Sequence, residues 1–339
     1  MRKLLIFGYM ISIFASAQAM GIEKYAGEFL TIGVGTRGLG MGGAQVAVSH
    51  DVTAAYWNPG SLALVNYPQL AAMHSQQFGG LVNYDYLGFA MPYKKSNSIG
   101  LSVVRLATDD IPYTALPRPN LPIDATYTDE SGNIVYNRPF VLKNVSWNEY
   151  AFFLTFAHRA NQTLSYGGNI KMIHKGDGEN TAWGVGFDIG LLWNPVAELL
   201  VGVNAQDVST TLLAWNTGTR ELVAPTLKTG VGYPLYLSSL NTRLVFAGDV
   251  DVRFEGRDYA AQASLGQMSF DFHLGSEIVI RDIVSLRIGS DYGHFTAGAG
   301  IKLPRLELGY AFFKHDYLDA THRVSLQLSL EEERFSRSE

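Results

Sequence analysis

Three residues on one expected strand of this chain have side chains that could bind a metal ion. Asp271, His273 and Glu277 occupy alternate positions on one face of an expected strand, residues 268–280. Carboxylate and imidazole groups are common ligands of divalent metals. A strand rises about 3.3 Å per residue, so groups at this spacing lie too far apart to converge on one ion without further ligands. We therefore expect neither a metal site nor a cofactor.

Patterns for catalysis and for nucleotide binding are equally weak. No nucleophile, histidine and orienting residue occur at a diagnostic spacing, and the chain has no cysteine. The glycine-dense stretch 33–43 lacks the Lys-Ser/Thr pair of a phosphate-binding loop. A formal net charge of −5 leaves no basic surface for nucleic acid. The sequence predicts a protein that is not an enzyme and has no nucleic-acid partner.

Ionisable residues instead recur on one face of several expected strands. In residues 242–254, charged side chains alternate with Leu244, Phe246, Val250 and Val252. This period of 2 is typical of a strand, because a helix would scatter the same residues around its circumference. We interpret the charged face as the lining of a lumen, held by ion pairs and hydrogen bonds. The proposed network comprises Asp249, Asp251, Arg253, Asp271, Glu277 and Arg287.

Strands with this alternation predict a closed sheet. The candidates lie near 69–77, 84–93, 98–107, 148–159, 164–175, 182–194, 198–209, 224–235, 242–254, 268–280, 284–293, 295–303, 306–314 and 322–330. If the first strand runs outward, every long connection falls on the outer side, as in bacterial outer-membrane barrels. We predict an all-β fold: a transmembrane antiparallel β-barrel of about 14 strands over residues 67–330, in the lipid bilayer of the outer membrane. A soluble β-sandwich or propeller would not explain the charged faces.

The two ends of the chain are expected to lie outside this barrel. Residues 1–19 have a positive start, a short apolar core and an Ala17-Gln18-Ala19 cleavage pattern, which predict a cleaved export signal. Residues 331–339, EEERFSRSE, should form a charged tail that dangles in the periplasm.

Residues 20–66 are expected to form a plug with a short helix near 44–55. A barrel of about 14 strands is too wide to be filled by its own side chains, so it must hold water, a ligand or a plug. Glycines permit close backbone packing, and either Arg37 or Asp51 should pair with the charged wall. The plug residues are Gly33, Gly35, Arg37, Gly38, Gly40, Gly42, Gly43, Asp51, Trp57, Asn58 and Pro59.

Residues 108–147 form the longest expected loop and contain five prolines between Pro112 and Pro139. Because proline disfavours both helix and sheet, we expect neither element there. The loop is either a solvated flap, a cover over the barrel mouth or a surface for docking a partner. The docking residues would be Asp109, Tyr113, Leu116, Tyr127 and Tyr136.

Two motifs give the chain a family resemblance. The run Gly33-x-x-x-Arg37-Gly38-x-Gly40-Met41-Gly42-Gly43-Ala44 precedes Asp51-x-x-Ala54-x-x-Trp57-Asn58-Pro59-Gly60. Together they resemble the N-terminal signature of the PorV/PorQ family of outer-membrane β-barrels, which is related to FadL-type barrels.

The resemblance implies a non-catalytic component of type IX secretion. Such a barrel would dock secreted cargo signal domains, a secretion pore or attachment-complex proteins through its extracellular loops. The alternative is a FadL-like transporter of hydrophobic small molecules. Asn-Pro-Gly at residues 58–60, where that class commonly has Asn-Pro-Ala, and the charged lumen both argue mildly against the alternative.

Overall fold

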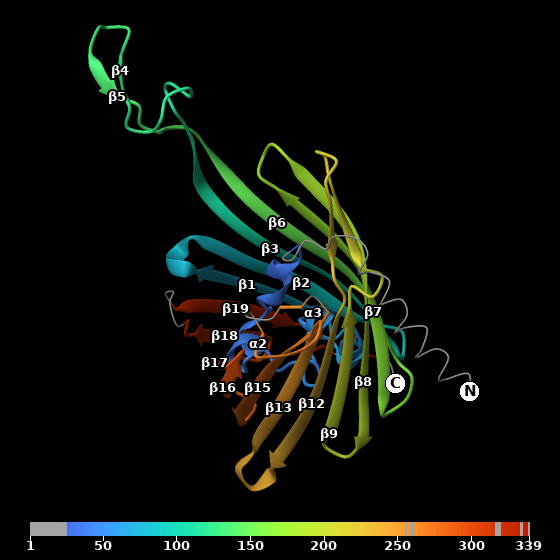
Figure 1. The fold of residues 1–339 in the computed structure, drawn as a ribbon. Helices are drawn as coiled ribbons and strands as arrows, with labels where there is room; N and C mark the ends of the chain where they lie inside the picture. The colour runs from blue at the N-terminus through green and yellow to red at the C-terminus, as the bar shows by residue number, and fades with distance from the viewer. Residues whose placement is uncertain (1–25, 255, 258–260, 316–319, 333–334, 338–339) are drawn as a thin grey trace.

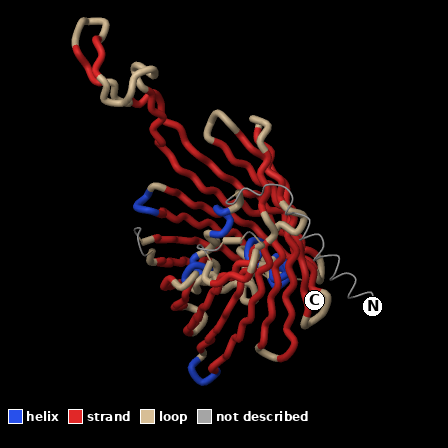
Figure 2. The backbone as a smooth tube through the Cα atoms, viewed as in Figure 1, coloured by secondary structure: helices blue, strands red, loops and turns tan. Residues whose placement is uncertain are grey.

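The computed structural model describes residues 26–254, 256–257, 261–315, 320–332 and 335–337. The predicted export signal, residues 1–19, lies outside the described residues. Strands dominate the described chain, and its helices are short (Figure 2). In the part of the chain that the structure describes, no helix is both long and apolar enough to cross a membrane.

Fourteen strands close into an antiparallel barrel (Figure 1). Strands that follow one another pair in order, and β1 closes on β19 from Gln69↔Ser329 to Gln76↔His322. The predicted fold class is therefore confirmed. The barrel strands are β1 (Gln69–Gln77), β2 (Val82–Tyr93), β3 (Asn97–Ala115), β6 (Phe140–Arg159), β7 (Leu164–Gly176), β8 (Thr181–Val196), β9 (Leu199–Gln206), β12 (Thr226–Leu237), β13 (Thr242–Arg253), β15 (Met268–Ile280), β16 (Val284–Asp291), β17 (His294–Lys302), β18 (Leu306–Phe313) and β19 (Thr321–Ser329).

The alternation of side chains explains why this sheet closes. In β8 every second residue from Trp183 to Leu191 is a large, exposed apolar residue, whereas Gly184 and Asp188 between them are buried. Large apolar groups thus point outward, and small or polar groups point inward. This is the arrangement that a lipid-facing barrel requires.

Short additional strands continue the barrel strands at one end. β10 (Thr211–Trp215) pairs with β8 beyond the end of β9, and β11 (Arg220–Val223) pairs with β10. β14 (Ala263–Leu265) pairs with the start of β15. We call this the long-loop end. The opposite, short-turn end carries compact connections, including η5 (Ser238–Leu240) and the turns at 281–283 and 303–305.

The region 108–147 is a β-hairpin over much of its length, so the prediction of neither helix nor strand was wrong. Beyond Ala107 on β3 and Asn148 on β6, these two strands pair only with each other. β4 (Thr126–Thr128) and β5 (Ile134–Tyr136) form a second hairpin at the tip. Pro112 is tolerated because β2 no longer pairs with β3 at that level, so no ladder bond is lost there. We call residues 108–147 the arm, which projects well beyond the barrel (Figure 1).

Candidate functional site

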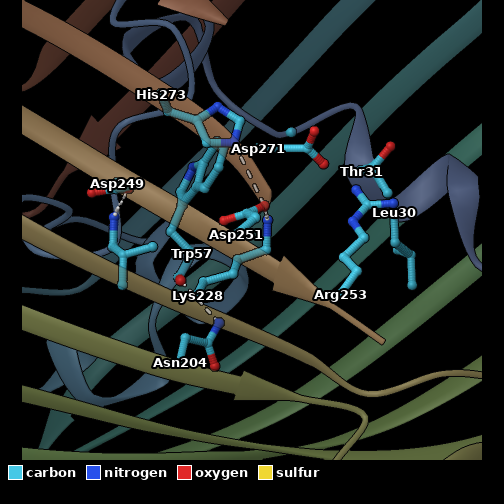
Figure 3. Close-up of polar contacts among 12 residues, drawn as sticks. Leu30, Thr31, Trp57, Asn204, Lys228, Asp249, Asp251, Arg253, Asp271 and His273 are labelled. Carbon is cyan, nitrogen blue, oxygen red and sulfur yellow. Dashed lines mark hydrogen bonds and ion pairs between the residues drawn. The ribbon is translucent and has the colours of Figure 1, made fainter. Parts of the chain in front are cut away.

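Residues 26–66, which we call the inner segment, lie inside the barrel (Figure 1). They contain η2 (Glu28–Thr31), α2 (Thr36–Gly40), α3 (Ala54–Trp57) and η3 (Pro59–Leu64). Asn204 of β9 donates a hydrogen bond to the carbonyl oxygen of Trp57 (2.9 Å, Figure 3), and Arg323 of β19 donates one to that of Gly33 (2.9 Å). The segment is therefore held by strands from well-separated parts of the barrel.

The helix expected near residues 44–55 forms only at its end, as α3. The backbone N–H groups of Gln45 and Val46 donate instead to Oδ2 of Asp249, at 2.6 and 2.8 Å. These N–H groups would lie in the first turn of the expected helix, where they have no partner within the helix. The Asp249 carboxylate therefore anchors the backbone of the inner segment to β13, but this contact does not explain why the helix is short.

Glycines of the barrel wall allow its backbone to touch that of the inner segment. A Cβ atom at Gly275 of β15 would lie 2.3 Å from the carbonyl oxygen of Met41, and one at Gly202 of β9 would lie 2.2 Å from that of Val46. Neither position can accept a side chain without movement of the segment. The same close approach occurs at Gly167, Gly190 and Gly289, whereas Gly309 lies against the side chain of Thr36.

The two charged residues singled out in the inner segment have different roles. Arg37 forms an ion pair with Glu277 (2.9 Å) and donates to the carbonyl oxygen of Val48 (2.9 Å). Asp51 instead accepts from the backbone N–H (2.8 Å) and the hydroxyl (2.5 Å) of Thr53 within its own turn. The structure therefore places Arg37, rather than Asp51, against the wall.

The remaining predicted plug residues pack the segment onto itself and onto the wall. The Trp57 indole donates to the Val34 carbonyl oxygen (3.1 Å), and its ring occupies the space beside Gly33 and Gly38. The Asn58 side-chain amide donates to the carbonyl oxygens of Val46 (2.7 Å) and Leu191 (3.0 Å). The other contacts are Pro59 against Gly190, Gly40 against Gly298, Gly42 against Ser290, Gly43 against His273 and Gly35 against Thr53.

The predicted wall network is divided into separate groups. Asp251 pairs with Lys228 and lies 3.6 Å from His273 (Figure 3), whereas Asp271 pairs with Arg257 (2.7 Å). Arg253 reaches Glu28 of the inner segment at 3.1 Å. A distinct chain joins Glu277 to Arg287 (2.7 Å) and Arg287 to Glu307 (3.3 Å).

His273 takes part in packing within the described structure. Its Nδ1 atom lies 2.9 Å from the Gly42 carbonyl oxygen and 2.9 Å from Asp291. In the described part of the chain, no group of three or more His, Cys, Asp or Glu residues is arranged to hold a metal ion.

Sequence reasoning missed several residues of this site. Lys228 and Asn204 have inward-facing positions on β12 and β9, so strand phase alone would have identified them. Glu28 carries no comparable signal, because it precedes the first strand. The wall glycines were also missed, although inward-facing glycines on neighbouring strands are a recognisable sign of close backbone approach.

Aromatic side chains gather on one side of the lumen, which we call the apolar side, and buried ion pairs lie there as well. Phe29, Tyr56 and Trp57 of the inner segment pack with wall residues that include Tyr84 of β2 and Phe153 of β6. Charged groups lie on β12, β13, β15 and β16, and also beside Phe153, where Lys171 pairs with Asp188 (3.1 Å) and Asp207 (2.9 Å). Two lumen cavities measure about 40 and 30 Å³, which is room for about one water molecule each.

Residues 335–337 of the C-terminal tail contact the barrel, so this part of the tail does not extend freely as expected. The Arg337 guanidinium donates to the carbonyl oxygens of Val65 (2.7 Å), Ala63 (3.0 Å) and Asn97 (2.9 Å). It also donates to the Ser98 hydroxyl (2.7 Å). An arginine can serve many carbonyl groups at once because it has five N–H donors. The tail therefore ties the end of the inner segment to β3.

The five residues predicted for docking are spread along the arm. Asp109 and Tyr113 lie on the part formed by β3, Leu116 follows β3, Tyr127 lies on β4 and Tyr136 on β5. Lys143, Arg118 and Arg138 lie over the rings of Tyr113, Tyr127 and Tyr136 at 5.3, 5.5 and 5.0 Å. These residues do not form one compact patch.

The tip of the arm is nevertheless a locally ordered turn. Asp129 accepts backbone hydrogen bonds from Asn133 and Ser131, both at 2.9 Å, and the bond from Asn133 is the largest effect that holds the pKa of Asp129 below its usual range. Ile123 and Ile134 are exposed nearby. The arm therefore presents apolar side chains on a defined backbone.

Comparisons with known proteins show the fold. No family model and no curated protein matches the chain. The Ralstonia pickettii toluene transporter TbuX is 12% identical, with a TM-score of 0.56 over 88% of this chain and 98% of that one. The CymD monoaromatic hydrocarbon channel is 12% identical, with a TM-score of 0.55 over 89% and 98% of the two chains. A Pseudomonas aeruginosa FadL homologue is 11% identical, with a TM-score of 0.50 over 87% and 98%. The chain thus has the fold of the FadL-like outer-membrane β-barrels.

Proposed function

We propose that this barrel carries small hydrophobic molecules across the outer membrane. The observation that carries the proposal is the fold shared with a toluene transporter and a monoaromatic hydrocarbon channel over almost the full length of those chains. The apolar side of the lumen, where Tyr56 and Phe153 meet at a ring-centroid distance of 6.3 Å, supports the same reading. Docking, which the sequence favoured, is therefore the second candidate function after transport.

In this proposal the inner segment is a plug that moves during transport. The segment occupies the lumen, so a molecule can pass only where its contacts with the wall loosen. The hydroxyls of Thr36 in the segment and Ser325 in β19 lie 2.7 Å apart. Cysteines at these positions would be close enough to join, and the chain has no cysteine that could interfere.

The test is uptake of labelled toluene by cells that express the barrel and lack other aromatic transporters. We expect uptake above that of cells with an empty vector, loss of uptake in oxidised Thr36→Cys/Ser325→Cys, and recovery on reduction. The Ser325→Cys single variant is the matched control. Uptake equal to the empty vector would refute transport, and undiminished uptake by the oxidised double variant would refute a moving plug.

Docking of exported proteins is the second candidate function. The projecting arm, with exposed Ile123, Ile134 and Tyr136, favours it, as does the resemblance to PorV/PorQ barrels of type IX secretion. Mild extraction of the tagged barrel should then retain secretion-pore, cargo or attachment proteins. Replacement of residues 116–139 by a short turn should release them without affecting toluene uptake. Retention of the same proteins by the shortened variant would exclude the arm tip as the docking element.

A further inference from the structure

A polar cavity of about 240 Å³ opens at the short-turn end of the barrel. It lies beside the turns at 281–283 and 303–305, and Arg37 and Glu277 form part of its lining. Bacterial barrels place their short turns in the periplasm. This cavity is distinct from the apolar side of the lumen and from the arm, and nothing said of it below depends on either proposed function.

Arg287 places a positive charge in the wall of this cavity. Its Nε donates to Glu277 (2.7 Å) and its Nη2 to Glu307 (3.3 Å), and only 2% of its side chain is exposed. A Cβ atom at Gly300 would lie 3.0 Å from Nη1, so this glycine leaves room for the guanidinium. Because Nη1 is buried, a molecule in the cavity would feel the charge of Arg287 without receiving a hydrogen bond from it.

Arg243 is a second cation with unused donors in the same cavity. It lies on the inward face of β13, opposite Val279 of β15. Its Nε is buried without an acceptor, and it forms no ion pair with any residue that the structure describes. The other cations of the cavity are already paired, namely Arg37 with Glu277, Lys302 with Glu331 and Arg305 with Glu332.

The cavity lining also limits which anion would fit. The fork of N–H donors on the Arg243 guanidinium matches the two oxygens of a carboxylate. Asp51, Asp282 and Glu307 line the same space and would repel a dianion such as phosphate more strongly than a monoanion. A volume of about 240 Å³ equals that of roughly eight water molecules, which suits a small organic acid.

We propose that this cavity binds the carboxylate of a small organic acid that enters from the short-turn end. The carboxylate accepts hydrogen bonds from the terminal nitrogens of Arg243, and Arg287 adds positive charge from the wall. The serine and glutamine side chains of Ser285, Gln327 and Ser329 line the space around it.

The test is a titration of benzoate into the purified full-length barrel in a non-ionic detergent at constant ionic strength. We expect saturable binding that weakens about tenfold or more in Arg243→Gln, because hydrogen bonds to a charged group are lost. The matched control is Arg305→Gln, which removes the same charge from a residue of the same cavity that is 61% exposed and already paired. Binding by this control should weaken far less than that of Arg243→Gln. Unchanged heat-dependent gel mobility would show that both variants are folded.

Three outcomes would overturn the proposal. They are no saturable benzoate binding up to about 10 mM, an equal loss of affinity in Arg305→Gln, and competition by sulfate or phosphate as strong as that by benzoate. Competition by acetate would support a free acid as the natural source. Competition by a short peptide with a free C-terminus, but not by its C-terminal amide, would support the same carboxylate chemistry with a polypeptide as the source.

Discussion

Adding one methyl group at Gly275 should loosen the inner segment. The Cβ atom of Gly275→Ala would lie 2.3 Å from the Met41 carbonyl oxygen and 2.7 Å from the Met41 Cβ. Both distances are about 1 Å shorter than van der Waals contact, so the segment or β15 must move by about that amount. Overpacking of this kind costs about 1–3 kcal/mol.

A matched substitution separates this effect from the ordinary consequence of replacing a strand glycine. Gly248 lies on the adjacent strand β13 and pairs with Leu274, the residue before Gly275. A Cβ atom there would meet only the end of the Leu274 side chain, at 3.3 Å. Alanine is favoured over glycine in a strand by about 0.5–1 kcal/mol. Gly248→Ala should therefore leave the inner segment as firmly held as before.

The assay measures the fraction of molecules in which the inner segment has detached from the barrel wall. Ser49 is buried in the segment, and Ser49→Cys supplies the sole thiol of a chain without cysteine. A charged maleimide should label this thiol about 5- to 150-fold faster in Gly275→Ala, because a loss of 1.4 kcal/mol raises the open population tenfold. Labelling at the unmodified rate in a folded Gly275→Ala barrel would refute the packing argument, as would equal acceleration by Gly248→Ala.

Two further substitutions test the polar contacts of the inner segment. Glu277→Gln leaves Arg37 and Arg287 without their shared carboxylate, and should cost about 3 kcal/mol or more; an unchanged temperature of heat-dependent gel shift would contradict this. Arg337→Gln removes bonds to Val65 and Asn97 from a half-buried residue and should cost about 1–2 kcal/mol, so a larger fall in melting temperature than that of Glu277→Gln would contradict the ranking.

Much of the barrel could be predicted from the sequence because alternation is a local property. Asp249, Asp251 and Arg253 face inward simply because they share a phase with one another and not with Val250 and Val252. The arm was mistaken for an irregular loop because its prolines were counted without regard to position. Pro112 lies where β3 has lost its neighbour β2, and a proline on an unpaired edge costs little.

The contacts of the site were harder to predict because they depend on residues far apart in the sequence. Arg37 was expected to meet a charged wall, but no local pattern selects Glu277 as its partner. The same holds for Asp249, because no local pattern predicts its two bonds to the backbone of Gln45 and Val46. The helix that the composition of residues 44–55 favours forms only at its end. Propensity differences amount to less than about 1 kcal/mol per residue, so the packing of a buried segment can override them.

Aromatic and charged side chains lie next to each other around the inner segment, and this has a consequence for permeability. The Lys171 ammonium lies 6.0 Å from the ring centroid of Phe153, and the Arg323 guanidinium lies 5.8 Å from that of Tyr84. Loosening of the segment there would expose an aromatic face together with a cation. An aromatic solute can contact both, because its ring attracts cations, whereas a saturated hydrocarbon gains only the apolar contact. A barrier built in this way can be selective without forming a filter of fixed diameter.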